Sequence, residues 1–128
     1  MHYPDYPFTP QRFEVRPGIE MSYLDEGPRD GDVVLMLHGN PSWSYYWRKL
    51  VSGLSERIVP DHVGMGLSDK PDDDAYRYTL ASRIDDVAAL LEHVGITGTL
   101  SLAVHDWGGM IGFGWALRDP ARVSRLVI

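Results

Sequence analysis

Asp106 lies between an apolar run and a glycine-rich segment, a position that suits a nucleophilic carboxylate. Residues 100–104 (LSLAV) are typical of a buried strand, and residues 107–118 are typical of a helix that begins almost at once. Strand, sharp turn and helix together predict that Asp106 sits at the apex, with its side chain lifted out of the sheet. Such a turn leaves no room for a side chain two positions further on, which explains Gly108. A carboxylate presented in this way can attack carbon and form a covalent ester.

Asn40 and Trp107 are the candidate hydrogen-bond donors around this carboxylate. Residues 33–37 (VVLML) are apolar on both faces, as in a parallel strand covered by helices, and Asn40 follows soon after them. Because the carboxyl ends of parallel strands meet at one edge of a sheet, we expect Asn40 near Asp106. The backbone N–H groups of Asn40 and Trp107 would then form an oxyanion hole, each donor contributing on the order of 10²–10³ in rate. The Asn40 amide and the Trp107 indole are neutral donors suited to a leaving group.

The polar residues at these turns also have structural interpretations. Asp106 could act only as the N-cap of the helix that follows it. His38 is expected to shape its loop through hydrogen bonds rather than to act as a base, and His105 to point away from the apex. No spacing among these three residues matches a known metal site, so we expect no metal. Residues 64–66 (GMG) lack the lysine and the serine or threonine of a phosphate-binding loop, and we expect a turn there.

The remaining sequence predicts the sheet that holds these turns. A hairpin is followed by alternating strands and helices, which indicates a mostly parallel α/β sheet with helices on both faces. We expect Ser42 as the N-cap of the first helix and Gly95 just beyond the second. After an irregular arm over 1–11, the expected strands cover 12–16, 20–25, 33–37, 58–61, 100–104 and 123–128, the expected helices cover 43–54, 79–93 and 107–118, and a loop covers 27–31.

The composition is that of an ordinary soluble globular chain. Its 128 residues are enough for one domain with one core, and 44% of them are hydrophobic and 23% charged. The net charge of −6, without a basic cluster, argues against nucleic-acid binding. There is no cysteine, which excludes disulfides and thiolate metal sites. The first residues do not form a signal peptide, and no apolar run approaches the roughly 20 residues that span a bilayer. We therefore expect a cytoplasmic protein without a transmembrane segment.

Three segments together carry a resemblance to a known family. They are residues 38–48 (HGNPSWSYYWR), 60–71 (PDHVGMGLSDKP) and 104–109 (VHDWGG). They resemble the haloalkane dehalogenase branch of the α/β-hydrolase superfamily, and residues 45–48 and 103–114 look closest to the OleB-type β-lactone decarboxylases. The turn at Asp106 is then similar to the nucleophile elbow of this fold, with aspartate where serine is more usual. Epoxide hydrolases share the aspartate but usually place an aromatic residue where Asn40 stands.

The resemblance implies a role for each candidate residue. Asp106 would be the nucleophile, and Asn40 and Trp107 would hold the leaving group or the oxyanion. The substrate would be small and hydrophobic, with no metal or organic cofactor. The implied activity is β-lactone decarboxylation to an olefin in long-chain hydrocarbon biosynthesis, through a covalent ester. The alternatives are hydrolytic carbon–halogen cleavage by a haloalkane dehalogenase and a non-catalytic truncated product.

The resemblance further implies that residues 1–128 are the N-terminal part of one α/β-hydrolase domain, truncated after about the sixth strand and without its cap domain. The histidine and the acid that complete the family's triad would follow the strand that begins at Val123, and Asp61 and Asp119 are poor substitutes for them. We therefore expect this fragment alone to be inactive. Its last strand would leave an exposed edge for self-association, and association with other enzymes of the pathway is the other partnership we consider.

Residues 55–60 are about three residues shorter than the family pattern requires between a helix and a strand of about five residues. Three interpretations are open at this point. The first helix ends near Gly53, or the strand is a stub, or the sequence has lost residues.

Overall fold

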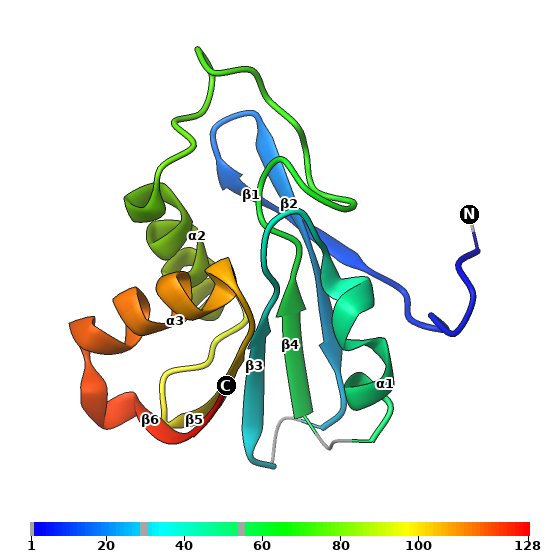
Figure 1. Cartoon of the computed structure of the whole chain (residues 1–128), viewed down its shortest axis with the longest axis vertical. Coiled ribbons are helices and arrows are strands. Elements are labelled where there is room, and N and C mark those ends of the chain that lie inside the picture. The colour runs from blue at the N-terminus through cyan, green and yellow to red at the C-terminus, as the bar shows by residue number, and fades with distance from the viewer. Residues whose placement is uncertain (1, 29–30, 54–55) are drawn as a thin grey trace.

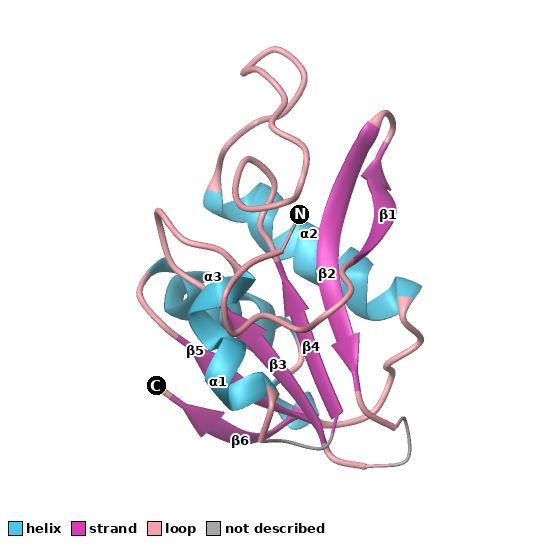
Figure 2. Cartoon of the chain, turned by 90° about the vertical axis from the view of Figure 1, so that its right-hand side faces the viewer, coloured by secondary structure: helices cyan, strands magenta, loops and turns pink. Residues whose placement is uncertain are grey.

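Six strands form one sheet in the computed structural model, which describes residues 2–28, 31–53 and 56–128. The strands are β1 (Gln11–Arg16), β2 (Ile19–Glu26), β3 (Val33–Leu37), β4 (Glu56–Pro60), β5 (Leu100–Val104) and β6 (Val123–Val127). Their order across the sheet is β1-β2-β4-β3-β5-β6 (Figure 2). β1 and β2 form an antiparallel hairpin, β2 pairs antiparallel with β4, and the pairs β4–β3, β3–β5 and β5–β6 are parallel. The predicted hairpin and the parallel sheet beside it are confirmed.

Helices cover both faces of this sheet (Figure 1). They are α1 (Arg48–Val51), which continues a 3₁₀ turn η1 (Ser44–Trp47), then α2 (Leu80–His93) and α3 (Trp107–Arg118), with a second 3₁₀ turn η2 (Pro120–Arg122) before β6. On one face Trp47 and Val51 pack on the inner residues of β2, β3 and β4. On the other face α2 and α3 enclose a larger core. Within the described residues no helix is both long and apolar enough to cross a membrane.

The ends of α2 follow the local sequence rules. The Thr79 side chain accepts a hydrogen bond from the Ser82 N–H, so Thr79 caps the first turn. At the other end Gly95 has a φ of 78°, a conformation that glycine adopts without strain. The Gly95 N–H donates to the Glu92 carbonyl and the Ile96 N–H to the Leu91 carbonyl, which is the Schellman arrangement. The predicted stop at Gly95 is confirmed.

The first helix is shorter than its periodicity predicted. The chain at Trp43 is extended, with φ −163° and ψ −178°, no side chain caps η1, and the helical segment ends at Val51. The prediction of Ser42 as an N-cap was therefore wrong. The physical reason is aromatic packing: the rings of Trp43 and Tyr45 stack on each other and contact the N-terminal arm instead of lining one side of a helix.

Between α1 and β4 the structure agrees with the first of the three interpretations, because the helical segment ends at Val51 and β4 is a full strand of five residues. Leu54 and Ser55, and likewise Arg29 and Asp30 in the expected 27–31 loop, lie outside the described residues.

The expected arm over residues 1–11 is mostly irregular, as predicted, but it is anchored. Tyr6 is buried, pairs with Tyr3 in an isolated bridge, and shares a 2.6 Å hydrogen bond with the Ser44 hydroxyl. The arm therefore fixes the segment that leads into α1.

Candidate active site

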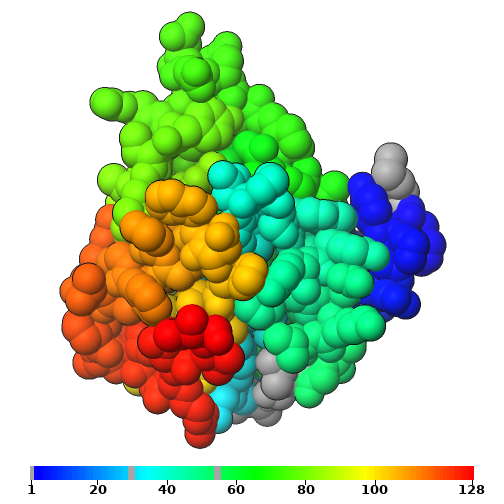
Figure 3. Space-filling model, viewed as in Figure 1, coloured from blue at the N-terminus to red at the C-terminus, as the bar shows by residue number. Residues whose placement is uncertain are grey.

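The turn after β5 has the strained, close-packed geometry that its sequence predicted. Asp106 has φ 56° and ψ −129°, and apart from Asp5 it is the one non-glycine residue with positive φ among the described residues. A Cβ at Gly108 would collide with the carbonyl oxygens of Leu37 and His38, and a Cβ at Gly39 would collide with the Asp106 side chain. In Figure 3 the segment after β3 and the start of α3 lie side by side on the visible face. The two glycines therefore allow the two turns to touch.

The Asp106 carboxylate is exposed and is held from one side. Its Oδ2 accepts a 3.0 Å hydrogen bond from the Asn40 N–H, and Asp106 stands at the N-cap position of α3 without making a side-chain cap. The peptide N–H groups of Asn40 and Trp107 hold the pKa of this carboxyl below its ordinary value, so it is ionised at neutral pH. The carboxylate therefore stays exposed while backbone N–H groups hold it.

The three predicted site residues come together, as expected. The Asn40 side chain is exposed, and the Trp107 side chain is 49% exposed. Trp107 is the first residue of α3, and Asn40 lies in the turn after β3, which contacts the start of α3.

A cavity of about 310 Å³ opens beside this turn. Asn40 and Trp107 form part of its wall, and the start of α2 forms another part. The lining residues are Gly39, Asn40, His62, Met65, Tyr78, Thr79, Leu80, Arg83, Trp107 and Ile111. Asp106 adjoins the cavity through Gly39 and Trp107, its neighbours in space and sequence, so a small apolar ligand in the cavity would lie next to the elbow.

Two buried histidines form the floor beneath these turns. The His62 N–H donates to His38 Nε2 over 3.0 Å, so His38 carries its proton on Nδ1, which donates to the Gly39 carbonyl over 2.7 Å. The His62 side chain in turn donates from Nε2 to the His38 carbonyl over 3.1 Å. Burial lowers the pKa of His38 to about 4 and that of His62 well below its ordinary value. The prediction that His38 shapes its loop is confirmed.

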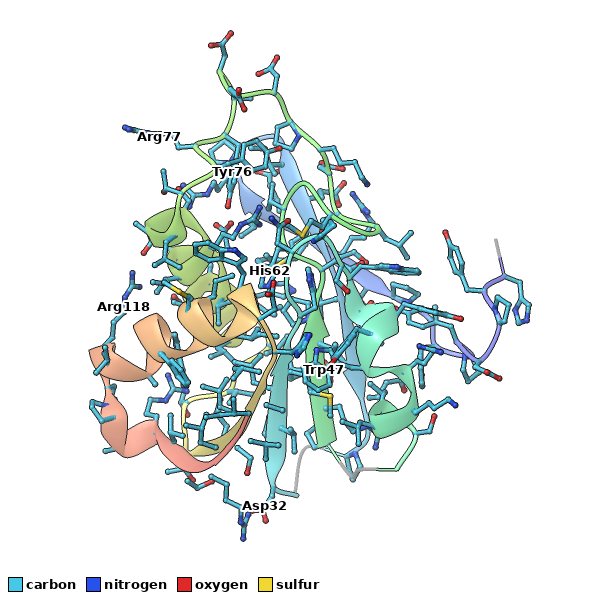
Figure 4. The ribbon with its side chains drawn as sticks, in the orientation of Figure 1. Asp32, Trp47, His62, Tyr76, Arg77 and Arg118 are labelled. Carbon is cyan, nitrogen blue, oxygen red and sulfur yellow. The ribbon has the colours of Figure 1, made fainter. Side chains whose placement is uncertain are left out.

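The sequence interpretation did not select His62, although it lies two residues beyond β4 and His38 lies directly after β3. Figure 4 places His62 in the interior at the carboxyl end of β4, next to the start of α3. A histidine shortly after a buried strand was the signal available. His105, by contrast, is exposed and stacks on Tyr46, with ring centroids 4.6 Å apart.

Asp61 has a bracing role in the loop after β4. Its side chain is buried and accepts from the N–H groups of Ser44 at 2.6 Å and Leu67 at 2.9 Å. Burial raises the pKa of Asp61 in spite of these hydrogen bonds. Residues 64–66 within the same loop form turns, as predicted, and no group of three or more metal-ligating side chains is found within the described parts of the chain.

The comparisons with known proteins agree with this fold. A family model described as the alpha/beta hydrolase fold matches residues 32–128. The chain therefore belongs to the α/β-hydrolase fold family.

The proteins that the chain is similar to include decarboxylases, haloalkane dehalogenases and epoxide hydrolases. The chain is 71% identical over 136 aligned positions to a cis-3-alkyl-4-alkyloxetan-2-one decarboxylase of Xanthomonas campestris pv. campestris, a match that covers 100% of the chain and 45% of the relative. It is 39% identical to a haloalkane dehalogenase of Mycolicibacterium paratuberculosis, covering 97% of the chain and 43% of that enzyme. The tetrameric haloalkane dehalogenase DpaA from Paraglaciecola agarilytica is similar in structure, with a TM-score of 0.85, 29% identity, and coverage of 98% of the chain and 44% of that protein. The chain thus spans less than half the length of these relatives.

Proposed function

We propose that Asp106 is the nucleophile of an enzyme that converts a β-lactone (an oxetan-2-one) to an olefin and carbon dioxide, the olefin-forming step of long-chain hydrocarbon biosynthesis. The observation that supports the proposal is the ionised, exposed Asp106 carboxylate, which the peptide N–H groups of Asn40 and Trp107 hold, and we assign the attack to Oδ1 because Oδ2 accepts the Asn40 N–H. The similarity to an alkyloxetanone decarboxylase supports the choice of substrate.

In the first step Asp106 Oδ1 attacks the alkyl-bearing ring carbon that is bonded to the ring oxygen, and not the carbonyl carbon. The bond between that carbon and the ring oxygen breaks, and its electron pair goes to the oxygen. The ring opens to an alkyl ester of Asp106 with a carboxylate on the neighbouring carbon. The Asn40 N–H stays on Oδ2 throughout, because Oδ2 becomes the carbonyl oxygen of the ester.

In the second step the bond to the carboxylate breaks, and its electron pair forms the carbon–carbon double bond. The bond between Oδ1 and the alkyl carbon breaks at the same time, which releases the olefin and carbon dioxide and restores the Asp106 carboxylate. The sum is one lactone to one olefin and one carbon dioxide, so no water is consumed. The 128 residues alone are expected to be inactive, so turnover is sought in a chain completed to the length of its relatives.

The second candidate is haloalkane dehalogenation, favoured by the similarity to two haloalkane dehalogenases and by the neutral donors Asn40 and Trp107. Here Oδ1 displaces a halide, and the alkyl ester can be cleared only by attack of water. The two reactions share their first bond formation and differ in how the alkyl ester is then cleared.

The products of two parallel incubations distinguish these functions. A chain completed to the length of its relatives is incubated with a cis-3,4-dialkyloxetan-2-one and, separately, with a 1-bromoalkane, and olefin, carbon dioxide and bromide are measured. We expect olefin and carbon dioxide in equal amounts from the lactone, and at most one bromide per chain from the bromoalkane. Repeated bromide release without olefin would favour the dehalogenase. Neither product, in a chain shown by circular dichroism to be folded, would favour the non-catalytic alternative.

A further inference from the structure

One wall of the cavity carries an isolated positive charge. Arg83 lines the cavity from the first turns of α2, and it is the only residue of the described lining that is charged at neutral pH. Its Nη1 donates to the Val63 carbonyl over 2.8 Å. No carboxylate within the described residues forms an ion pair with it, in contrast to Arg16, which is paired with Asp86 at 3.0 Å.

The first turns of α2 and α3 add to this positive charge, and the carboxylate that acts on Arg83, that of Asp86 in the next turn of α2, is itself paired with Arg16 and bonded by the Tyr76 hydroxyl. Both α2 and α3 begin at the cavity, through Leu80 and Trp107, so the positive ends of two helix dipoles face it, and the first turn of α2 contains no acidic residue. His62, in the same wall, stays neutral because it is buried. The wall therefore favours an anion.

A second observation points to a polar occupant. His62 is only 2% exposed, and its Nδ1 has no hydrogen-bond partner among the described residues, while its Nε2 is used on the His38 carbonyl. A buried acceptor of this kind ordinarily has a partner. A water that donates one hydrogen to Nδ1 and the other to a bound anion would satisfy it.

We infer that Arg83 and the adjoining wall form a carboxylate-binding subsite, which takes the carboxylate that appears when a β-lactone ring opens on Asp106. The inference rests on the proposed function, because that reaction is what creates the carboxylate. When the ring bond breaks, negative charge moves onto the former ring oxygen, and a guanidinium is the side chain best suited to a planar carboxylate. A departing halide also becomes an anion, but it is a single atom that would be held by Asn40 and Trp107 and has no planar pair of oxygens for the guanidinium, so the loss of Arg83 should slow the lactone reaction more than the halide reaction.

The test compares the rates at which two electrophiles modify Asp106. Intact-mass spectrometry follows the chain with a dialkyl β-lactone, counting adduct plus released olefin, and with a 1-bromoalkane of similar length. We expect Arg83→Gln to slow the lactone reaction about 100-fold and to leave the bromoalkane reaction within about threefold. Arg83→Lys should recover part of the loss. Brief treatment with neutral hydroxylamine separates the alkyl ester, which survives, from a mixed anhydride formed by attack on the carbonyl.

Arg77→Gln is the matched control, since it removes one positive charge just before α2 from a side chain that projects outward (Figure 4). We expect Arg77→Gln to react at the rate of the unmodified chain with both electrophiles. If Arg83→Gln slows both reactions equally in a folded chain, or slows neither, the carboxylate subsite is wrong. If the lactone yields neither an adduct nor olefin with the unmodified chain, the proposed function itself fails.

A binding measurement keeps the two failures separate. Decanoate is titrated against the chain and the resonances of α2 are followed by NMR. We expect saturable binding that weakens at least tenfold in Arg83→Gln, and 1-decanol should bind without this dependence. Equal decanoate binding in both proteins would overturn the subsite whatever the labelling shows.

Discussion

Two aspartates each come shortly after a buried strand of the same sheet, and the structure uses them in opposite ways. Asp61, after β4, is buried and has both carboxylate oxygens occupied by backbone N–H groups of Ser44 and Leu67. Asp106, after β5, is exposed, and its Oδ2 accepts from the Asn40 N–H. Their pKa values move in opposite directions, upward for Asp61 because of burial and downward for Asp106 because of the peptide N–H groups.

The difference shows how one sheet edge separates bracing from chemistry. A carboxylate that is enclosed and fully bonded fixes a loop, but it has no oxygen left to attack a substrate. A carboxylate at a strained apex, where Gly39 and Gly108 allow the two turns to touch, is ionised and exposed. Burial and hydrogen-bond occupancy, rather than residue type, therefore identify Asp106 as the nucleophile candidate.

The largest effect expected from this contrast is on stability at Asp61. Asp61→Ala leaves the Ser44 and Leu67 N–H groups without their acceptor, at about 1–3 kcal/mol for each buried group, so we expect a loss of about 4 kcal/mol in the free energy of unfolding. Asp61→Asn keeps one acceptor and should lose less. Urea denaturation measures both. The matched variant Asp106→Ala should unfold at nearly the same urea concentration as the unmodified chain, and equal losses at the two positions would remove the contrast.

The buried histidines predict a smaller, pH-dependent effect. The pKa of His38 is about 4 in the folded chain against 6.5 in the unfolded one, so the unfolded chain binds the proton more readily. Its contribution is therefore fully present above pH 6.5 and is lost as the pH falls towards 4, by about 3 kcal/mol at about 1.4 kcal/mol per pKa unit. Thermal unfolding across this range should show the fall, and His38→Gln should flatten it. A curve for His38→Gln parallel to that of the unmodified chain would show that His38 is not held neutral.

The smallest expected effect is a shift in the pKa of each of the two aspartates, in opposite directions. In carboxyl ¹³C NMR we expect Asp106 to titrate below the ordinary value of 3.8 and Asp61 above it. Asn40→Pro removes the N–H that Oδ2 accepts, so the Asp106 midpoint should rise towards 3.8. Asn40→Ala keeps that N–H and serves as the control. An Asp106 midpoint that stays in place in Asn40→Pro would show that the Asn40 N–H does not set it.

Much of this architecture could be predicted from local sequence. β3 and β5 are continuous apolar runs, and the strand–Asp–Trp–Gly–Gly–helix order indicated the elbow before any contact was known. The meeting of Asn40 with Asp106 followed from the rule that parallel strands share their carboxyl edge. These features depend on residues close together in sequence, or on the sheet's general topology.

The parts that were missed depend on long-range packing. The helical spacing of Trp43 and Trp47 predicted a long helix, but the N-terminal arm brings Tyr3 and Tyr6 onto Trp43 and changes the local conformation. An arginine in a helix is usually a surface residue, and only the fold shows that Arg83 lines a cavity shared with Trp107. His62 was missed because it lies in a loop, and its burial follows from the packing of the turns after β3 and β4 against each other.

Strand β6 lies at one edge of the sheet. Among the described strands β6 is paired only with β5, and Leu126, Val127 and Ile128 at the end of the chain are exposed. This apolar edge is where the predicted self-association would occur.

The most direct test of the central claim is the site of covalent modification. The chain is reacted with a 1-bromoalkane, digested with a protease, and sequenced by tandem mass spectrometry. We predict one added alkyl group on Asp106, stable to neutral hydroxylamine, and none in Asp106→Asn. An alkyl group on Asp61 or on a histidine in place of Asp106, or unchanged labelling in Asp106→Asn, would contradict the assignment of Asp106 as the nucleophile.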